Sequence, residues 1–216
     1  MPSGSRLTLP NIITLARIAL CPLVFFLALA QGSGARYAAF VLFLAAALSD
    51  IWDGYIARKH GLITDMGKLL DPLADKLLLA ATFFPFYIIS HRSGEANRIQ
   101  FWDDMPVWVL VVIFGRELFI TIFRQWAQRR GVVIAAGKSG KFKAAFQNTF
   151  VGALLLWYPL VESANRNGWL ASAWWPAVET GLGGLIGATL AIALVLTVYS
   201  MVDYLWSYRS LVGVRD

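Results

Sequence analysis

Long apolar runs alternate with short polar connections along the 216 residues of the chain. Six of these runs approach or exceed the roughly 18 apolar residues that a helix needs to cross a bilayer. They are Ile12–Ala30, Tyr37–Ile56, Leu69–Ser90, Met105–Ala127, Ala144–Val161 and Leu182–Trp206. The pattern predicts an all-α integral membrane protein with six transmembrane helices. Because no repeat or polar linker divides the runs, we expect residues 1–216 to form a single membrane domain.

Composition favours a membrane over water as the solvent. Apolar residues make up 58% of the chain and charged residues 15%, against about 45–50% and about 25% in soluble domains. A cleavable signal peptide is an alternative for the first run, because Arg6 precedes it and Ala28-Leu29-Ala30 resembles a cleavage site. Arg17 interrupts that run, so we expect the first helix to stay.

Basic residues are distributed unevenly between the two predicted sides of the membrane. Of the 19 Lys and Arg residues, eleven lie on the side of the N-terminus, four on the opposite side and four inside the runs. The positive-inside rule therefore predicts that both termini are cytoplasmic. Anionic lipid headgroups at that face account for the net charge of +6, so membrane lipid is the expected partner and nucleic acid is not.

Four aspartates gather at the cytoplasmic ends of the second and third runs. Asp50 and Asp53 are three residues apart, and Asp71 and Asp75 are four apart, so each pair shares one helical face. Helices joined by a short turn are neighbours, so the pairs can face each other.

Carboxylates that converge inside a membrane repel one another and are costly without a counter-charge. Oxygen-only ligands favour Mg²⁺, Mn²⁺ or Ca²⁺ over Zn²⁺, and a site with two metal ions is the natural arrangement. The alternatives are a solvated loop with accidental spacing and a cation or proton relay inside a transporter.

Three small residues, Gly54, Ala57 and Gly67, each lie one helical turn from an aspartate of this set. The carboxylate face is therefore also free of bulky side chains, which leaves room for a ligand. The alternative is that these residues let two helices approach closely, as small residues do in membranes.

The complete spacing, Asp50-x2-Asp53-Gly54-x2-Ala57-Arg58-x8-Gly67-x3-Asp71-x3-Asp75, resembles the signature of the CDP-alcohol phosphatidyltransferase family. The resemblance implies an enzyme that displaces CMP from a CDP-linked lipid by joining its phosphatidyl group to an alcohol. It implies that two divalent cations, Mg²⁺ or Mn²⁺, are held by Asp50, Asp53, Asp71 and Asp75.

The resemblance also assigns further roles around the signature. Asp75 is implied to be the base that takes the proton from the attacking hydroxyl. Gly54, Arg58 and Thr64 are implied to contact the CDP-lipid, and we expect the cleft beside Ala57 and Gly67 to take the same substrate.

Outer segments resemble the branch of that family that makes phosphatidylglycerophosphate from CDP-diacylglycerol and glycerol 3-phosphate. They are Pro10-Asn11-Ile12-Ile13-Thr14-Leu15-Ala16-Arg17, Gly115-Arg116-Glu117 with Arg124, Gly140-Lys141-Phe142-Lys143 leading into Gln147, and Val202-Asp203-Tyr204. Asn11 and Thr14, with Arg17, are expected to line the pocket for the CDP-lipid diphosphate. The alternative for Asn11 and Thr14 is helix capping.

Cations in and near the fourth and fifth runs require an anion. We expect the acceptor's phosphate to bind there, because guanidinium suits bidentate phosphate contact; the residues are Arg116, Arg124, Lys141 and Lys143. Alternatively, Arg116 pairs with Glu117 or with the aspartates, and the lysines anchor anionic lipid.

Several functions remain open at this point. Phosphatidylglycerol, giving cardiolipin, or inositol phosphate could replace glycerol 3-phosphate as acceptor. A cation transporter or a purely structural membrane protein would have no transferase activity at all. The resemblance implies a homodimer. From the apolar runs and the distribution of basic residues we expect a multi-pass protein of the inner (cytoplasmic) membrane, with its active site facing the cytoplasm.

Overall fold

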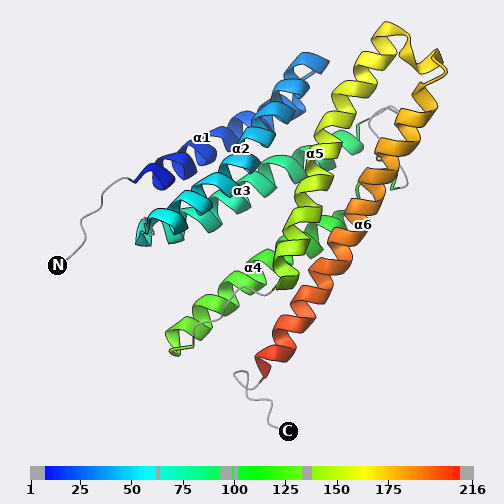
Figure 1. Ribbon diagram of the computed structural model, residues 1–216. Helices are drawn as coiled ribbons and strands as arrows, with labels where there is room; N and C mark the ends of the chain where they lie inside the picture. The colour runs from blue at the N-terminus through cyan, green and yellow to red at the C-terminus, as the bar shows by residue number, and fades with distance from the viewer. Residues whose placement is uncertain (1–7, 62–63, 93–98, 100–101, 133–137, 210–216) are drawn as a thin grey trace. The chain divides into compact units, whose positions relative to one another are not determined.

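The computed structural model describes residues 8–61, 64–92, 99, 102–132 and 138–209. Six α-helices account for most of this part of the chain (Figure 1). They are α1 (Leu9–Leu29), α2 (Ser33–His60), α3 (Asp65–Ser90), α4 (Val107–Arg129), α5 (Lys138–Asn167) and α6 (Trp175–Ser207). A short 3-10 helix, η2 (Trp169–Ala171), lies between α5 and α6. The all-α prediction is confirmed, and each predicted run overlaps one helix.

Five of the helices are long and apolar enough to cross a membrane: α1, α2, α3, α5 and α6. Helix α4 has sufficient length, with 23 residues, but Arg116 and Glu117 lie near its middle and Arg124 lies in its C-terminal part. Membrane crossing by α4, and with it the count of six spans, stays a prediction. The cytoplasmic location of both termini also stays a prediction.

The helices fall into two compact units. The first unit contains α1, α2, α3, the part of α5 from Val151 and the start of α6 up to Pro176. The second contains α4, the part of α5 up to Phe150 and α6 from Ala177. The organisation of the chain as a single domain stays a prediction.

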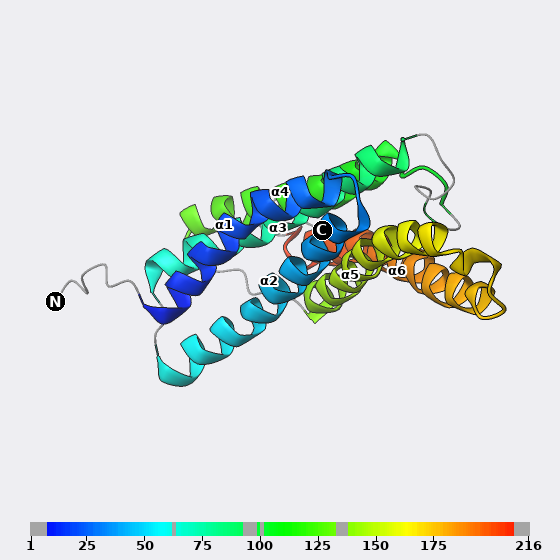
Figure 2. The same cartoon turned by 90° about the horizontal axis from the view of Figure 1, so that it is seen from above.

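In the first unit, α1 packs along both α2 and α3 (Figures 1 and 2). Helix α5 joins them through Gly152, where an added Cβ would lie 3.5 Å from the ring of Phe43 on α2. The rings of Phe86 and Tyr158, 6.1 Å apart, join α3 to α5.

The connection between α2 and α3 is defined by a glycine cap and a threonine cap. Helix α2 ends at Gly61, whose φ of 63° is the left-handed conformation that glycine adopts without strain. Helix α3 begins after Thr64, whose hydroxyl accepts a hydrogen bond from the Gly67 N–H. This N-cap starts the helix at Asp65, before the apolar run at Leu69, so Asp71 and Asp75 lie in regular helix.

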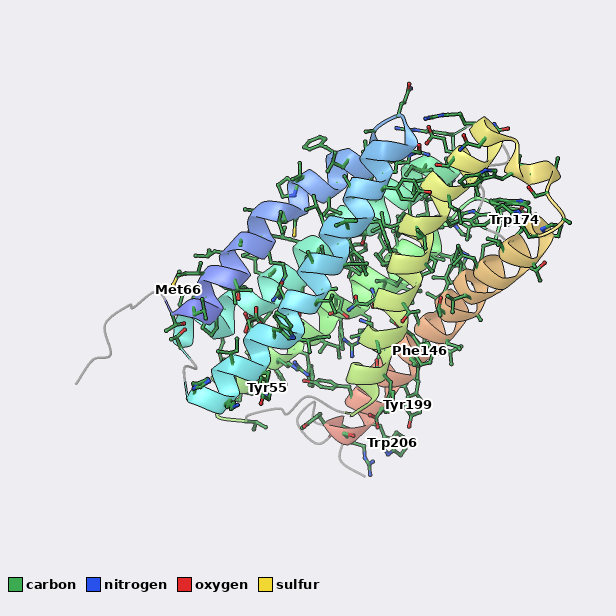
Figure 3. The ribbon with its side chains drawn as sticks, turned by 45° about the horizontal axis from the view of Figure 1, so that its top comes forward. Tyr55, Met66, Phe146, Trp174, Tyr199 and Trp206 are labelled. Atoms are coloured by element: carbon green, nitrogen blue, oxygen red, sulfur yellow. The ribbon has the colours of Figure 1, made fainter. Side chains whose placement is uncertain are left out.

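Large apolar side chains are exposed along the helices, as expected when the surrounding solvent is lipid. Figure 3 shows Tyr199 and Trp206 on α6, where they are 58% and 69% exposed. Trp174, the residue before α6, is 50% exposed. These side chains support the membrane interpretation of the sequence.

Candidate active site

Arg17 of α1 connects three of the four motif aspartates. Its guanidinium pairs with Asp50 and Asp53 of α2, and its Nη1 lies 3.7 Å from Oδ1 of Asp75 on α3. The Arg17 side chain is 1% exposed, so these contacts are made away from bulk solvent. The sequence placed Arg17 beside the site but did not identify its carboxylate partners.

Thr14, one helical turn before Arg17, reaches the fourth aspartate. Its hydroxyl lies 3.0 Å from Oδ1 of Asp71, to which it can donate, and 3.5 Å from Oδ2 of Asp53. The same hydroxyl is 3.0 Å from the Pro10 carbonyl. Side chains of α1 therefore contact all four aspartates, which the structure brings together from α2 and α3.

Asn11, Thr64 and Gly67 form a tight corner beside Thr14. The Thr64 hydroxyl donates to Oδ1 of Asn11 at 3.0 Å while accepting from the Gly67 N–H, also at 3.0 Å. A Cβ at position 67 would lie only 2.9 Å from Asn11 Oδ1, so close approach requires glycine here. Asn11 and Thr14 do not cap α1, whose N-cap is Thr8, so the capping alternative is wrong for both.

One hydrogen-bond donor of this corner, the side-chain amide nitrogen of Asn11, has no protein acceptor among the described residues. This atom, Nδ2, is buried. A buried amide donor without a partner is costly, so this atom is suited to an acceptor oxygen of a ligand.

The aspartates differ in their access to the outside of the unit. The Asp53 side chain is 5% exposed, whereas those of Asp50 and Asp75 are 47% and 63% exposed. Gly54 and Ala57 are half-buried on α2. The side chain of Arg58 lies outside those that the structure describes. The site is therefore closed at Asp53 and accessible at Asp75.

The donor chemistry of this set fits hard divalent cations, because every candidate ligand is a carboxylate oxygen. Within the described part of the chain, no group of three or more His, Cys, Asp and Glu side chains is arranged to hold a metal ion. The Arg17 guanidinium contacts the same carboxylates. A cation bound at Oδ1 of Asp50 or Oδ2 of Asp53 would therefore compete with Arg17 for that oxygen.

A second polar cluster lies within the second unit and contains two of the predicted acceptor residues. Glu117 of α4 pairs with Lys143 of α5 and, at 3.0 Å, with Nη1 of Arg116. Nη2 of Arg116 donates to the Ser200 hydroxyl of α6 at 3.1 Å. The alternative that Arg116 pairs with Glu117 is thus what the structure contains.

Two buried donors in the second unit remain without a hydrogen-bond partner among the described residues, Nε of Arg116 and Nε2 of Gln147. Gln147 follows Lys143 by one helical turn and shares its face. The sequence placed Gln147 in a segment that resembles the family but gave it no binding role; its spacing from Lys143 is the signal that could have assigned one.

Arg124, also predicted to bind the acceptor, has a protein partner as well. Its Nε donates to the Tyr204 hydroxyl at 3.0 Å, and its guanidinium carbon lies 5.6 Å from the centre of that ring. The side chain of Lys141 lies outside the described side chains. The sequence did not assign Tyr204 or Ser200 to the site.

A family model described as CDP-alcohol phosphatidyltransferase matches residues 7–199. The chain belongs to this family. Members of the CDP-alcohol phosphatidyltransferase family generally use divalent metal ions. The match runs from α1 into α6 and includes the four signature aspartates, Arg17 and the Arg116, Glu117 and Lys143 cluster.

The curated relatives are named for two activities, phosphatidylglycerophosphate synthesis and cardiolipin synthesis. CDP-diacylglycerol–glycerol-3-phosphate 3-phosphatidyltransferase of Bacillus subtilis is 40% identical over 160 residues, which are 68% of this chain and 76% of the relative. A probable phosphatidylglycerophosphate synthase of Mycobacterium tuberculosis is 35% identical over 213 residues, 96% of this chain and 85% of the relative. Cardiolipin synthase (CMP-forming) of Oryza sativa is 38% identical over 162 residues, 71% of this chain and 47% of the relative.

Proposed function

We propose that this CDP-alcohol phosphatidyltransferase transfers the phosphatidyl group of CDP-diacylglycerol to glycerol 3-phosphate, giving phosphatidylglycerophosphate and CMP. The observation that carries the proposal is the gathering of all four signature aspartates around Arg17 and Thr14 of α1. The names of the relatives from B. subtilis and M. tuberculosis support glycerol 3-phosphate as the acceptor.

We assign the metal site to the motif aspartates, with Asp50, Asp53, Asp71 and Asp75 as ligands of two divalent cations, Mg²⁺ or Mn²⁺. Bound there, the cations would neutralise the diphosphate and align the attacking oxygen. Asp75 would accept the proton of the acceptor hydroxyl. Its exposure of 63% supports this role, because an incoming alcohol can reach its carboxylate.

The CDP-lipid would bind along the corner between α1, α2 and α3. Its proposed contacts are Asn11, Thr14, Gly54, Ala57, Arg58, Thr64 and Gly67. The unpartnered Nδ2 of Asn11 supports this assignment, because it can donate to a phosphate or cytidine oxygen. The acyl chains would stay in the bilayer beside the apolar helix faces.

The acceptor's phosphate would bind the cations of the second unit, Arg116, Arg124, Lys141 and Lys143. Arg116 and Lys143 share a single carboxylate, Glu117, so the pair keeps a surplus positive charge. The unpartnered Nε of Arg116 adds a donor that suits a phosphate oxygen.

The proposal includes a location and an assembly. We propose a single-domain, multi-pass protein of the inner membrane with its site facing the cytoplasm, where the basic residues are concentrated and where glycerol 3-phosphate and CMP are soluble. We propose a homodimer by analogy with the family.

Cardiolipin synthesis is the second candidate, because the rice relative with that name is 38% identical. Purified protein with Mg²⁺ and CDP-diacylglycerol should be offered glycerol 3-phosphate, phosphatidylglycerol or inositol phosphate, with CMP and the lipid product both measured. Of the three acceptors, we expect only glycerol 3-phosphate to give CMP release, with phosphatidylglycerophosphate as the lipid product. Cardiolipin as the main product would overturn the acceptor assignment.

Matched variants separate transferase chemistry from transport or a structural role. Asp71→Asn should abolish CMP release, whereas Asp104→Asn, which changes an exposed acid outside the signature, should leave it unchanged. Cation flux into vesicles without CMP release would indicate a transporter. Wild-type activity in Asp71→Asn would contradict the proposed site.

A further inference from the structure

Arg17 occupies an unusual position for a positive charge, deep in α1 among the carboxylates assigned above to metal binding. It is among the largest side chains that are fully buried. Its Nη1 contacts Asp50 and approaches Asp75, and its Nη2 contacts Asp53. Its Nε is buried and has no hydrogen-bond partner among the described residues.

We propose that Arg17 is a built-in counter-ion that competes with divalent cations for the oxygens of Asp50, Asp53 and Asp75, and thereby sets the cation affinity of the site. This inference rests on the proposed function, which assigns these carboxylates to metal binding. It adds a positioning residue from α1 that the family signature, confined to α2 and α3, does not contain.

Competition follows from the atoms involved. Arg17 lies against one oxygen of each carboxylate, Oδ1 of Asp50, Oδ2 of Asp53 and Oδ1 of Asp75. A cation that binds one of these oxygens competes with the guanidinium for its lone pairs and for the space beside it. The guanidinium does not do the work of two divalent cations, because its single positive charge is shared among three carboxylates. Arg17 therefore stabilises the packed aspartates while opposing cation binding.

The size of the effect can be bounded. A hydrogen bond to a charged group corresponds to roughly tenfold to hundredfold in an equilibrium constant. Removing the guanidinium should therefore lower the dissociation constant for Mn²⁺ by about tenfold or more. It should also destabilise the protein in EDTA, since the buried carboxylate of Asp53 then loses the guanidinium that pairs with it.

The experiment titrates MnCl₂ into the full-length protein in detergent and measures free Mn²⁺ by electron paramagnetic resonance. Arg17→Gln should bind Mn²⁺ about tenfold more tightly than wild type. In EDTA, Arg17→Gln should unfold at a lower temperature than wild type, as followed by tryptophan fluorescence. Adding Mn²⁺ should raise the unfolding temperature of the variant by more than it raises that of wild type. Neither readout depends on catalytic turnover.

Arg36→Gln is the matched control, because Arg36 is another nearly buried arginine of the first unit but pairs with Glu162, at 3.6 Å. Its Mn²⁺ affinity should equal that of wild type. If Arg17→Gln aggregates, Arg17→Lys provides the test, because an ammonium group spans fewer carboxylates and should also tighten Mn²⁺ binding.

Equal or weaker Mn²⁺ binding by the folded Arg17 variants would overturn the role of Arg17 and leave the proposed reaction intact. Absence of Mn²⁺ binding by wild type would instead refute the metal site itself, together with this role. CMP release in the acceptor assay tests the proposed function separately from both.

Discussion

Replacing Gly67 by alanine tests whether the corner of Asn11, Thr64 and Gly67 forms part of the CDP-lipid site. The new Cβ would lie 2.9 Å from Asn11 Oδ1 and 3.2 Å from Thr64 Oγ1. The Asn11 amide must retreat to an ordinary contact distance of at least 3.4 Å. This movement stretches or breaks its 3.0 Å hydrogen bond with the Thr64 hydroxyl.

The effect on stability should be small. Loss of a neutral hydrogen bond costs about 0.5–1.5 kcal/mol, while alanine in a helix gains about 0.5–1 kcal/mol over glycine. We therefore expect the free energy of unfolding to stay within about 1 kcal/mol of wild type. The helix propensity of alanine does not offset the effect on substrate binding. When the Asn11 amide moves, its Nδ2 moves away from the position proposed for its contact with the CDP-lipid. The KM for CDP-diacylglycerol should rise about tenfold.

The assay is the initial rate of CMP release in mixed micelles, with CDP-diacylglycerol varied at saturating glycerol 3-phosphate. Gly34→Ala is the control, because Gly34 lies in the first turn of α2 and an added Cβ there has nothing within 4 Å. It should keep the wild-type KM. A wild-type KM in Gly67→Ala would refute the assignment of this corner, as would an equal rise in the control.

Three further predictions concern single side chains. Asp53→Asn should reduce CMP release about 100-fold or more, with helix content by circular dichroism unchanged; retention of a tenth of the activity would contradict its role as a ligand. Glu117→Gln frees two buried cations, so the KM for glycerol 3-phosphate should fall about threefold to tenfold while the unfolding temperature drops; a higher KM would argue against phosphate binding there. Tyr204→Phe removes the acceptor for Arg124 Nε and should lower the free energy of unfolding by about 1–3 kcal/mol; unchanged thermal unfolding would show that this hydrogen bond contributes little.

Helical periodicity explains why the carboxylate arrangement was accessible from sequence. The spacing of Asp50 and Asp53, and of Asp71 and Asp75, fixes which face of each helix carries them, whatever the rest of the fold does. The short connection at Gly61 and Thr64 then makes α2 and α3 neighbours in sequence. Both features are local, so one sequence suffices to predict them.

Which basic residue pairs with the aspartates could not be predicted from the sequence in the same way. Arg58 and Lys76 lie closer in sequence to the aspartates than Arg17 does, yet Arg17 supplies the contacts with Asp50 and Asp53. That outcome depends on the rotation and depth of α1 against two other helices, which hydropathy does not encode. In the same way, the pairing of Glu117 with Lys143 joins α4 to α5 across 26 positions and rests on tertiary packing.

Pairing between Arg17 and the acids of α2 also affects how the chain enters the bilayer during synthesis. A lone ionised side chain at the middle of a membrane helix costs about 2.5–3.5 kcal/mol on the insertion scale. When α1 and α2 leave the translocon as a hairpin, the opposite charges of Arg17 and Asp53 can enter lipid already matched. The first two helices are therefore expected to insert into the bilayer together, because Asp53 of α2 neutralises the charge of Arg17 on α1.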